Sequence, residues 1–475
     1  MSEFSWPAEF LPADAGLRAL VLRATGLVTR ATPLTVTLLG GDPEPPNPSR
    51  AEDSQLIADL ATVAADVEAL APLDDNEDEM DRLTLRHGLQ RALAAAEADQ
   101  PDAPAALERH LLARLLRLLH EPGRGMEQLL DLVEHAPAFL RAARPLQTGG
   151  SRLAGEVAVE AAGRLPLLLD ACAAAGRELA PVALRFRLEA ALGVLLQAGA
   201  EESGWLLKEY LPGAVDGVVL PPDTVREGLG HDLAELEGLA EAALADAVLI
   251  QPTDAPAPPV VHDIADVRRA WDDAAAAAVD RGGRAALDVE LLATPAWLLP
   301  MVPPLCLALP GPLAEAPARL LVGRGLTGTA VDVTLLRLTE FMPWAEQRGH
   351  HRAARLLLPL PDLGEGWRAS VRETVPGGEP PWALELAWRA ALALASISMT
   401  TRGTTVDQAA GLVAAESGMP EATARLQCVH LRRRPLGALT FLAGRSAVAA
   451  AVKRVGPGGV LRAGSLSAAA ARLLV

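Results

Sequence analysis

Apolar residues recur at the spacing of a helix through most of the first half of the chain, and this pattern constrains the fold most strongly. In residues 52–70 they make one face of a helix apolar, standing at Leu56, Leu60, Val63, Val67 and Leu70. The same pattern covers the ranges 82–98, 104–120, 126–145, 151–175, 181–200 and 231–248. Half of the 475 residues are hydrophobic, which is enough to bury a large core. We therefore predict a bundle of long antiparallel helices in this half.

The second half differs because prolines and glycines interrupt its helical pattern. Prolines concentrated between Pro252 and Pro259 indicate a boundary between a helical N-terminal lobe, 1–250, and a C-terminal lobe, 251–475. Within the second lobe, short apolar runs bounded by turn residues predict strands at Leu305–Leu309 and Arg319–Val322. Helices are predicted at 263–281, 328–358 and 382–398. The expected fold class is mainly α (α+β), with a small β-sheet in the second lobe; one continuous domain is the alternative to two lobes.

A tight pair of helices is predicted near the C-terminal end. Thr405 and Gln408 have the spacing of a capping box at a helix start. Gly418 suits the left-handed residue that ends a helix, and Pro420 suits the first turn of the next one. The expected helices cover 406–416 and 420–433.

Charge and cysteine content exclude several classes of protein. The net charge of −17 at pH 7 repels nucleic-acid phosphates and anionic lipid surfaces. Three distant cysteines without a CxxC motif favour neither a disulfide framework nor a structural zinc site. The first residues lack a basic and then apolar signal segment, and the longest uncharged run, Leu291–Ala314, is rich in prolines that a spanning helix would not tolerate. We expect a cytoplasmic protein that neither spans a membrane nor binds nucleic acid.

The segment 339–367 holds the side chains that most suggest chemistry. Glu340 and Glu346 precede an adjacent histidine pair, His350 and His351, and Glu365 follows. A zinc peptidase needs two imidazoles, a carboxylate ligand and a further Glu that activates the bound water. On a helix, Glu346 and His350 would share one face, whereas the adjacent histidines would point in different directions. The metal-ligand candidates are thus His350, His351, Glu346 and Glu365, with Glu340 and Glu365 as catalytic remnants, although no intact HExxH precedes them.

Several motifs, taken in order along the chain, resemble one bacterial family. The matching segments are Thr294–Pro300 with Leu309–Pro312 (TPxxLxPLxP…PPGP), Thr401–Ala409 (TKGWSREQA) and Arg434–Phe441 with Gly444 (RPGQALSYKxG). Together with 339–367 they resemble family 885 of the domains of unknown function, whose members are helical, zincin-like proteins. The resemblance covers much of residues 50–450. It implies a zincin-like C-terminal lobe and a metal-dependent hydrolase, most simply a peptidase.

The centre of the family motif reads HEAYPGHH, followed by EGWALY. One register places Thr339–Pro343 on HEAYP, which keeps Glu340 but puts Thr339 in place of the first histidine. The other register places Gly349–His351 on GHH, which puts Trp344 and Ala345 where HE should stand. In neither register do both imidazoles and the catalytic Glu remain.

Other departures also fall on polar residues. Thr400 replaces a family histidine, Gly437 a glutamine and Phe441 a tyrosine, so that ring volume is kept while the hydroxyl is lost. Scaffold residues of the same motifs remain, namely Pro295, Gly403, Pro435 and Gly444. This pattern predicts a fold that is maintained while its chemistry is lost.

The preferred hypothesis is a catalytically degenerate metallohydrolase-like protein, a pseudoenzyme without a cofactor. It would bind a peptide or a partner protein by shape and apolar contact through the former cleft, which comprises Trp344, Trp367, Thr400, Gly437 and Phe441. One alternative is an active zinc-dependent peptidase or hydrolase whose metal site has been rebuilt from the candidates above. A second is a regulatory nucleic-acid-binding protein that uses 405–434, where a helix–turn–helix pattern ends in Arg432–Arg434. The acidic net charge argues against this last reading.

Overall fold

The computed structural model is mostly helical, with two small sheets, and confirms the predicted fold class. It describes residues 5–31, 39, 54–98, 103–147, 152–214, 229, 231–250, 258–281, 283, 289–312, 314, 316–348, 350–358, 360–375, 379–433 and 437–474. The proposed lobe boundary at Pro252–Pro259 lies mainly outside the described residues. No helix in the described ranges is long and apolar enough to cross a membrane.

All the helices predicted in the first half are present, with ends a few residues from those expected. They are α4 (Ser54–Ala69), α5 (Asn76–Ala98), α6 (Ala103–Leu118), α7 (Pro122–Gln147), α8 (Arg152–Leu179), α9 (Val182–Trp205) and α12 (Leu233–Leu249). Shorter elements are η1 (Ala8–Phe10), η2 (Leu206–Tyr210) and α10 (Leu211–Gly213), and α1 (Ala15–Ala31) precedes α4. The apolar stripes are buried as the pattern requires: Leu107, Leu111 and Leu115 of α6 are fully buried.

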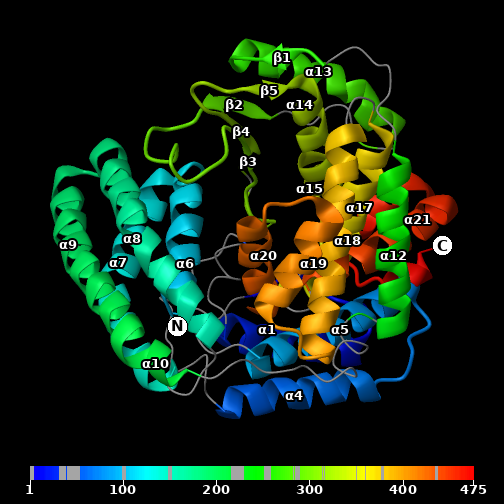
Figure 1. Cartoon of the computed structure of the whole chain (residues 1–475), viewed down its shortest axis with the longest axis horizontal. Helices are drawn as coiled ribbons and strands as arrows, with labels where there is room; N and C mark the ends of the chain where they lie inside the picture. Colours follow the sequence, from blue (N-terminus) through cyan, green and yellow to red (C-terminus); the bar gives the residue numbers. More distant parts are fainter. Residues whose placement is uncertain are drawn as a thin grey trace.

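The packing of these helices does not divide the chain at residue 250. Helices α6 to α9 form one bundle, on the left of Figure 1. Helices α1, α4 and α5 instead share a core with Ala353, Ala354 and Leu357 from the second half. Helix α12 packs along α18 (Glu379–Thr401), also far from the bundle. The segments before and after the bundle therefore pack together into a second unit, which we call the C-terminal body although it includes α1, α4 and α5.

The larger sheet has the strand order β2-β4-β3. β3 (Leu305–Ala308) and β4 (Arg319–Val322) are antiparallel and confirm both predicted strands. β2 (Glu290–Ala293), which was not predicted, pairs in parallel with β4. β1 (Val260–Val261) and β5 (Gly328–Thr329) form a separate antiparallel pair. The sheet also contacts the bundle, because Ala308 and Leu321 belong to the bundle's core cluster.

The single helix predicted at 328–358 is wrong. The segment holds α14 (Ala330–Leu336), the π-helical turn η3 (Arg337–Phe341), α15 (Met342–Gln347) and, after a break, α16 (Ala353–Leu357). Pro343 has no N–H to donate to the carbonyl of Thr339, and the helix widens directly before it. The wide turn moves Glu340 to a position that a regular helix would not give it.

The remaining helices follow the predictions more closely. α13 (Ile264–Asp280), α18, α19 (Val406–Ser417) and α20 (Glu421–Arg433) lie where expected, whereas α17 (Asp362–Thr374), α21 (Gly437–Ala463) and η4 (Ala470–Leu473) were not predicted. The capping box is present: the Thr405 hydroxyl accepts from the Gln408 amide at 3.3 Å, and Gln408 accepts from the Thr405 amide at 3.1 Å. Gly418 ends α19 in the left-handed region, with φ 69°.

Helices α17 and α21 cross in direct backbone contact, and two motif glycines make this possible. A Cβ atom on Gly444 would lie 1.9 Å from the Asp362 carbonyl oxygen. A Cβ atom on Gly366 would lie 2.1 Å from the Gly444 carbonyl oxygen. Because no side chain fits at either position, this crossing fixes the position of α17 relative to α21, and with it the position of Glu365.

Candidate functional site

The two predicted catalytic remnants, Glu340 and Glu365, meet at one arginine. Glu340 projects from the π turn η3, and its carboxylate lies 2.7 Å from the Arg368 guanidinium. Glu365, in the first turn of α17, lies 2.7 Å from the same guanidinium. Burial lowers the pKa of Arg368, but the charges of Glu340 and Glu365 outweigh it and the net shift of the pKa is upward. The two carboxylates thus hold a permanent cation between them.

The ion pairs continue from Glu365 across to α18. Arg389 contacts the second oxygen of Glu365, and its Nε lies 2.8 Å from Glu385. Glu385 also binds Arg372 at 2.9 Å. We call this alternating series the carboxylate–arginine ladder; its members are Glu340, Arg368, Glu365, Arg389, Glu385 and Arg372.

Phe441 packs against one end of the ladder, at Arg389. The Arg389 guanidinium lies 4.8 Å from the centre of the Phe441 ring, a cation–π contact. Trp382 packs edge-on against the same ring, with 6.3 Å between the ring centres. Phe441 is buried, so the position that the family resemblance assigns to a tyrosine offers no hydroxyl to a ligand.

The side chains around Glu340 and Glu365 do not fit a zinc ion. Both oxygens of Glu365 already bind arginines, and a divalent cation would have to displace two guanidinium charges. The Thr339 hydroxyl is engaged within its own helix, where it donates to the Leu335 carbonyl at 2.8 Å. Among the residues that the structure describes, no group of three or more His, Cys, Asp or Glu side chains could hold a metal ion.

The expected pairing of Glu346 with His350 on one helical face is not formed. Helix α15 ends at Gln347, so His350 lies beyond it in the following loop. Glu346 is buried, whereas His350 is exposed. The structure therefore does not bring Glu346, His350 and His351 to the carboxylates of Glu340 and Glu365 as a rebuilt metal site would require.

The residues assigned to the former cleft do not line one surface. Trp367 is buried and donates to the Leu338 carbonyl at 2.8 Å. Trp344 belongs to a different core cluster and donates to the Pro310 carbonyl at 3.3 Å. Thr400 is buried, with its hydroxyl bonded inside α18, while Gly437 is exposed at the start of α21. The two rings therefore lie in separate parts of the core, and each indole N–H has its own backbone acceptor.

His350 and His351 instead line a pocket of about 580 Å³ elsewhere in the C-terminal body. The pocket is rich in arginine, and its other lining residues are Glu9, Glu77, Arg352, Arg355, Arg454, Val455, Gly459, Arg462, Ala463 and Leu474. The His351 ring lies 5.4 Å from the Phe10 ring, edge to face. Burial, then Arg348 and His350, lower the pKa of His351.

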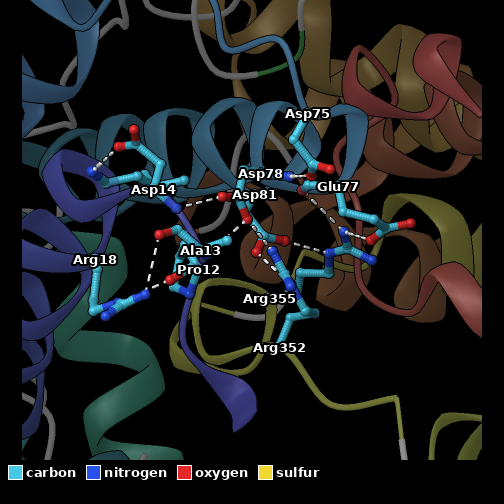
Figure 2. Close-up of polar contacts among 11 residues, drawn as sticks. Pro12, Ala13, Asp14, Arg18, Asp75, Glu77, Asp78, Asp81, Arg352 and Arg355 are labelled. Carbon is cyan, nitrogen blue, oxygen red and sulfur yellow. Dashed lines mark hydrogen bonds and ion pairs between the residues drawn. The ribbon is translucent and has the colours of Figure 1, made fainter. Parts of the chain in front are cut away.

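One wall of this pocket is a buried ion-pair cluster on α5 (Figure 2). Asp81 is fully buried and lies 2.7 Å from Arg352 and 2.6 Å from Arg355. Asp78 also binds Arg352, and it accepts the backbone amide of Asp14 at 2.7 Å. The cluster thereby joins the N-terminal segment, α5 and the loop before α16.

Sequence reasoning missed the arginines that occupy both regions. Arg368 stands three residues after Glu365, a spacing that favours an ion pair on a helix and was a readable signal. The other arginines come from segments distant from their partners, so no local spacing predicts those ion pairs; they are Arg389, Arg352 and Arg355.

The predicted nucleic-acid segment forms the helix pair α19–α20, but its arginine cluster cannot be placed. The side chains of Arg432 and Arg433, and all of Arg434, lie outside the described residues. On α20, Ala424 and Cys428 face a core cluster shared with α18 and α19. Arg425 pairs with Asp407 at 2.9 Å. This reading stays a prediction.

The comparisons with known proteins identify the fold but no activity. No protein-family model matches the sequence, and no curated protein matches it. One similar structure is a "putative lipoprotein" from Colwellia psychrerythraea, with a TM-score of 0.69 and 14% identity over 96% of this chain and 98% of that one. Another is a "putative lipoprotein of unknown function" from Shewanella oneidensis, with a TM-score of 0.66 and 13% identity over 97% and 99% of the two chains. At such identities the likeness shows a shared fold alone.

Proposed function

We propose that this protein is a non-catalytic relative of zincin-like hydrolases, a pseudoenzyme that acts by binding. The observation that carries the proposal is the Arg368 guanidinium, held between Glu340 and Glu365 at 2.7 Å from each. In the register that places Thr339–Pro343 on HEAYP, these two glutamates match the catalytic Glu of the resembled family and the Glu of its EGW motif. In that register, a guanidinium would take the place of the family's metal cation.

The chemistry of a guanidinium supports this reading. A guanidinium donates hydrogen bonds but has no vacant coordination position. It therefore cannot bind a water molecule as a Lewis acid and lower the pKa of that water. Glu340 is engaged by Arg368 and is not a free general base. Phe441 has no hydroxyl with which to stabilise an oxyanion. Hydrolysis would need an activated water, a general base and an oxyanion donor, and these residues supply none of the three.

A binding role agrees with what remains accessible at the ladder. The side chains of Glu340 and Arg368 are 34% and 37% exposed, so a partner would meet a charged edge there. We propose that the partner is a peptide or protein recognised by hydrogen bonds to this edge, instead of the apolar contact expected from the tryptophans. A cytoplasmic location also stays a prediction; because the two similar structures are titled as lipoproteins, cell fractionation is the direct check.

The alternative, an active zinc peptidase, is favoured by one observation, the convergence of Glu340 and Glu365 on one point. It would require Arg368 to leave that point when metal binds. The nucleic-acid-binding alternative has no comparable observation in its favour.

Metal content and hydrolysis decide between these functions. The wild type, Arg368→Gln and the control Arg372→Gln are purified without chelator, and zinc per chain is measured together with peptidase activity. Arg372 is the matched control because it lies on the same helix and contacts Glu385 but neither Glu340 nor Glu365. We expect substoichiometric zinc and no zinc-dependent hydrolysis in the wild type. Stoichiometric zinc, with hydrolysis abolished by Glu365→Ala, would establish the enzyme instead.

A further inference from the structure

We propose that the arginine-lined pocket around His350 and His351 binds a small molecule through a phosphate group. The pocket is separate from the ladder and is not used by the proposed pseudoenzyme function. Its volume of about 580 Å³ lies within the range of small-molecule sites. Its walls come from η1, α5, the loop before α16, α21 and the C-terminal segment, so folding must bring distant parts of the chain together to form it.

The inner wall of the pocket is rigid and already satisfied. Arg355 donates to Asp81 and Glu77 and, through Nη1, to the Ala463 carbonyl at 2.7 Å. Arg352 is held by Asp78 and Asp81. These two guanidiniums keep their partners, and their role is to fix the shape of the wall.

The outer arginines keep donors that a ligand can use. Within the described part of the chain, Arg462 makes no hydrogen bond or ion pair, and its side chain is exposed at the last turn of α21. Arg454 donates one bond, from Nη2 to the Ala471 carbonyl at 2.8 Å, which leaves its other edge open. Both residues line the pocket from α21, on either side of the kink at Gly456, where φ is 72°.

The charges of the lining favour an anion over a cation. The carboxylates of Asp78, Asp81 and Glu77 are bound by the inner arginines. Glu9 lines the same pocket and has no such partner among the described residues. The lining itself holds four arginines against two glutamates, Glu9 and Glu77, because Asp78 and Asp81 are not part of it. The surface that a ligand would touch is therefore positive, which favours an anion over a metal ion at His350 and His351.

The arrangement suits a phosphate in particular. A phosphate group carries up to two negative charges and offers acceptor oxygens in several directions, whereas a carboxylate offers two in one plane. The guanidiniums of Arg454 and Arg462 and the imidazole of His351 line the same pocket, so their N–H groups are available to several oxygens of one ligand. The geometry therefore points to a phosphate ester or pyrophosphate as the ligand chemistry.

Calorimetric titration with inorganic pyrophosphate tests the site. The wild type should bind one equivalent saturably at pH 7, and Arg462→Gln and Arg454→Gln should each bind roughly tenfold more weakly, since each loses a charge-assisted donor. Arg177→Gln is the matched control, because Arg177 is exposed on α8 in the bundle. Glu9→Gln should bind about two- to fivefold more tightly through loss of an opposing charge.

Parallel titrations with succinate identify the anion. Weaker binding of succinate than of pyrophosphate supports a phosphate site, and the reverse order overturns that choice. The proposal is also overturned if pyrophosphate fails to bind saturably, or if Arg177→Gln weakens it as much as Arg462→Gln does. We expect these surface variants to leave zinc content and hydrolysis unchanged. Failure of the phosphate proposal would therefore be distinguishable from failure of the pseudoenzyme proposal.

Discussion

Replacing Gly444 with alanine should destabilise the protein by separating α17 from α21. The new Cβ would lie 1.9 Å from the Asp362 carbonyl oxygen, whereas carbon–oxygen contacts ordinarily begin at about 3.3 Å. One of the two helices must therefore move by roughly 1.4 Å, the difference between these distances. The three nearest atoms, two of Asp362 and one of Gly366, all belong to the backbone, so no side chain can rotate away to relieve the contact.

The expected free-energy change follows from two opposing effects. Overpacking a core contact costs about 1–3 kcal/mol, and a clash with backbone places this one at the upper end. Alanine recovers about 1 kcal/mol relative to glycine inside a helix. The net destabilisation is therefore about 2 kcal/mol.

Gly411→Ala provides the control because it makes the same chemical change in the exposed helix α19, where the new Cβ meets no atom within 4 Å. This variant should be stabilised by up to about 1 kcal/mol. Urea denaturation followed by circular dichroism compares the midpoints of both variants with that of the wild type. Equal midpoints for Gly444→Ala and Gly411→Ala would refute the close helix crossing and the placement of Glu365 that depends on it.

Three further predictions concern buried polar groups. Burial lowers the pKa of His87 and His110 to about 4, from 6.5 in the unfolded chain. Each neutral ring therefore contributes up to about 3 kcal/mol of stability above pH 6.5, and this contribution is lost as the pH falls from 6.5 to 4. Urea midpoints at pH 7 and pH 5 measure this loss, and equal midpoints would contradict it. Arg355→Met leaves Asp81 buried with one arginine instead of two and should lower the unfolding free energy by about 3 kcal/mol, measured by the same denaturation. Phe441→Tyr adds a hydroxyl at a buried ring and should cost about 1–3 kcal/mol without creating peptidase activity; any hydrolysis gained would contradict the pseudoenzyme proposal.

The sequence predicted the helices of the first half well because their apolar stripes are long and regular. It failed at 328–358, where Pro343 widens the helix and later residues end it, because apolar spacing does not reveal a π turn. It also missed β2, whose pairing with β4 depends on a partner 29 residues away. The division at residue 250 followed composition, but α12 packs on α18, so the boundary does not coincide with the packing.

For the candidate site, the sequence identified Glu340, Glu365 and Phe441, which the structure does gather around Arg368 and Arg389. It could not show that arginines fill the space between them, because those contacts join the π turn η3, α17, α18 and α21. The family resemblance itself stays a prediction, since the comparisons test the fold only.

The amino-acid sequence alone determined the helical class, the helix ends at Thr405 and Gly418, and the side chains available at the motif positions, where Thr339 and Thr400 have no imidazole and Phe441 has no hydroxyl. These are local properties, set by side-chain periodicity, backbone capping and the chemical identity of single residues. Only the tertiary structure decided which charges meet: that Arg368 lies between two glutamates, and that Arg454 and Arg462 line one pocket with the two histidines. An ion pair depends on distance in space, and the chain folds segments hundreds of residues apart to within 3 Å of each other, as for Arg352 and Asp81.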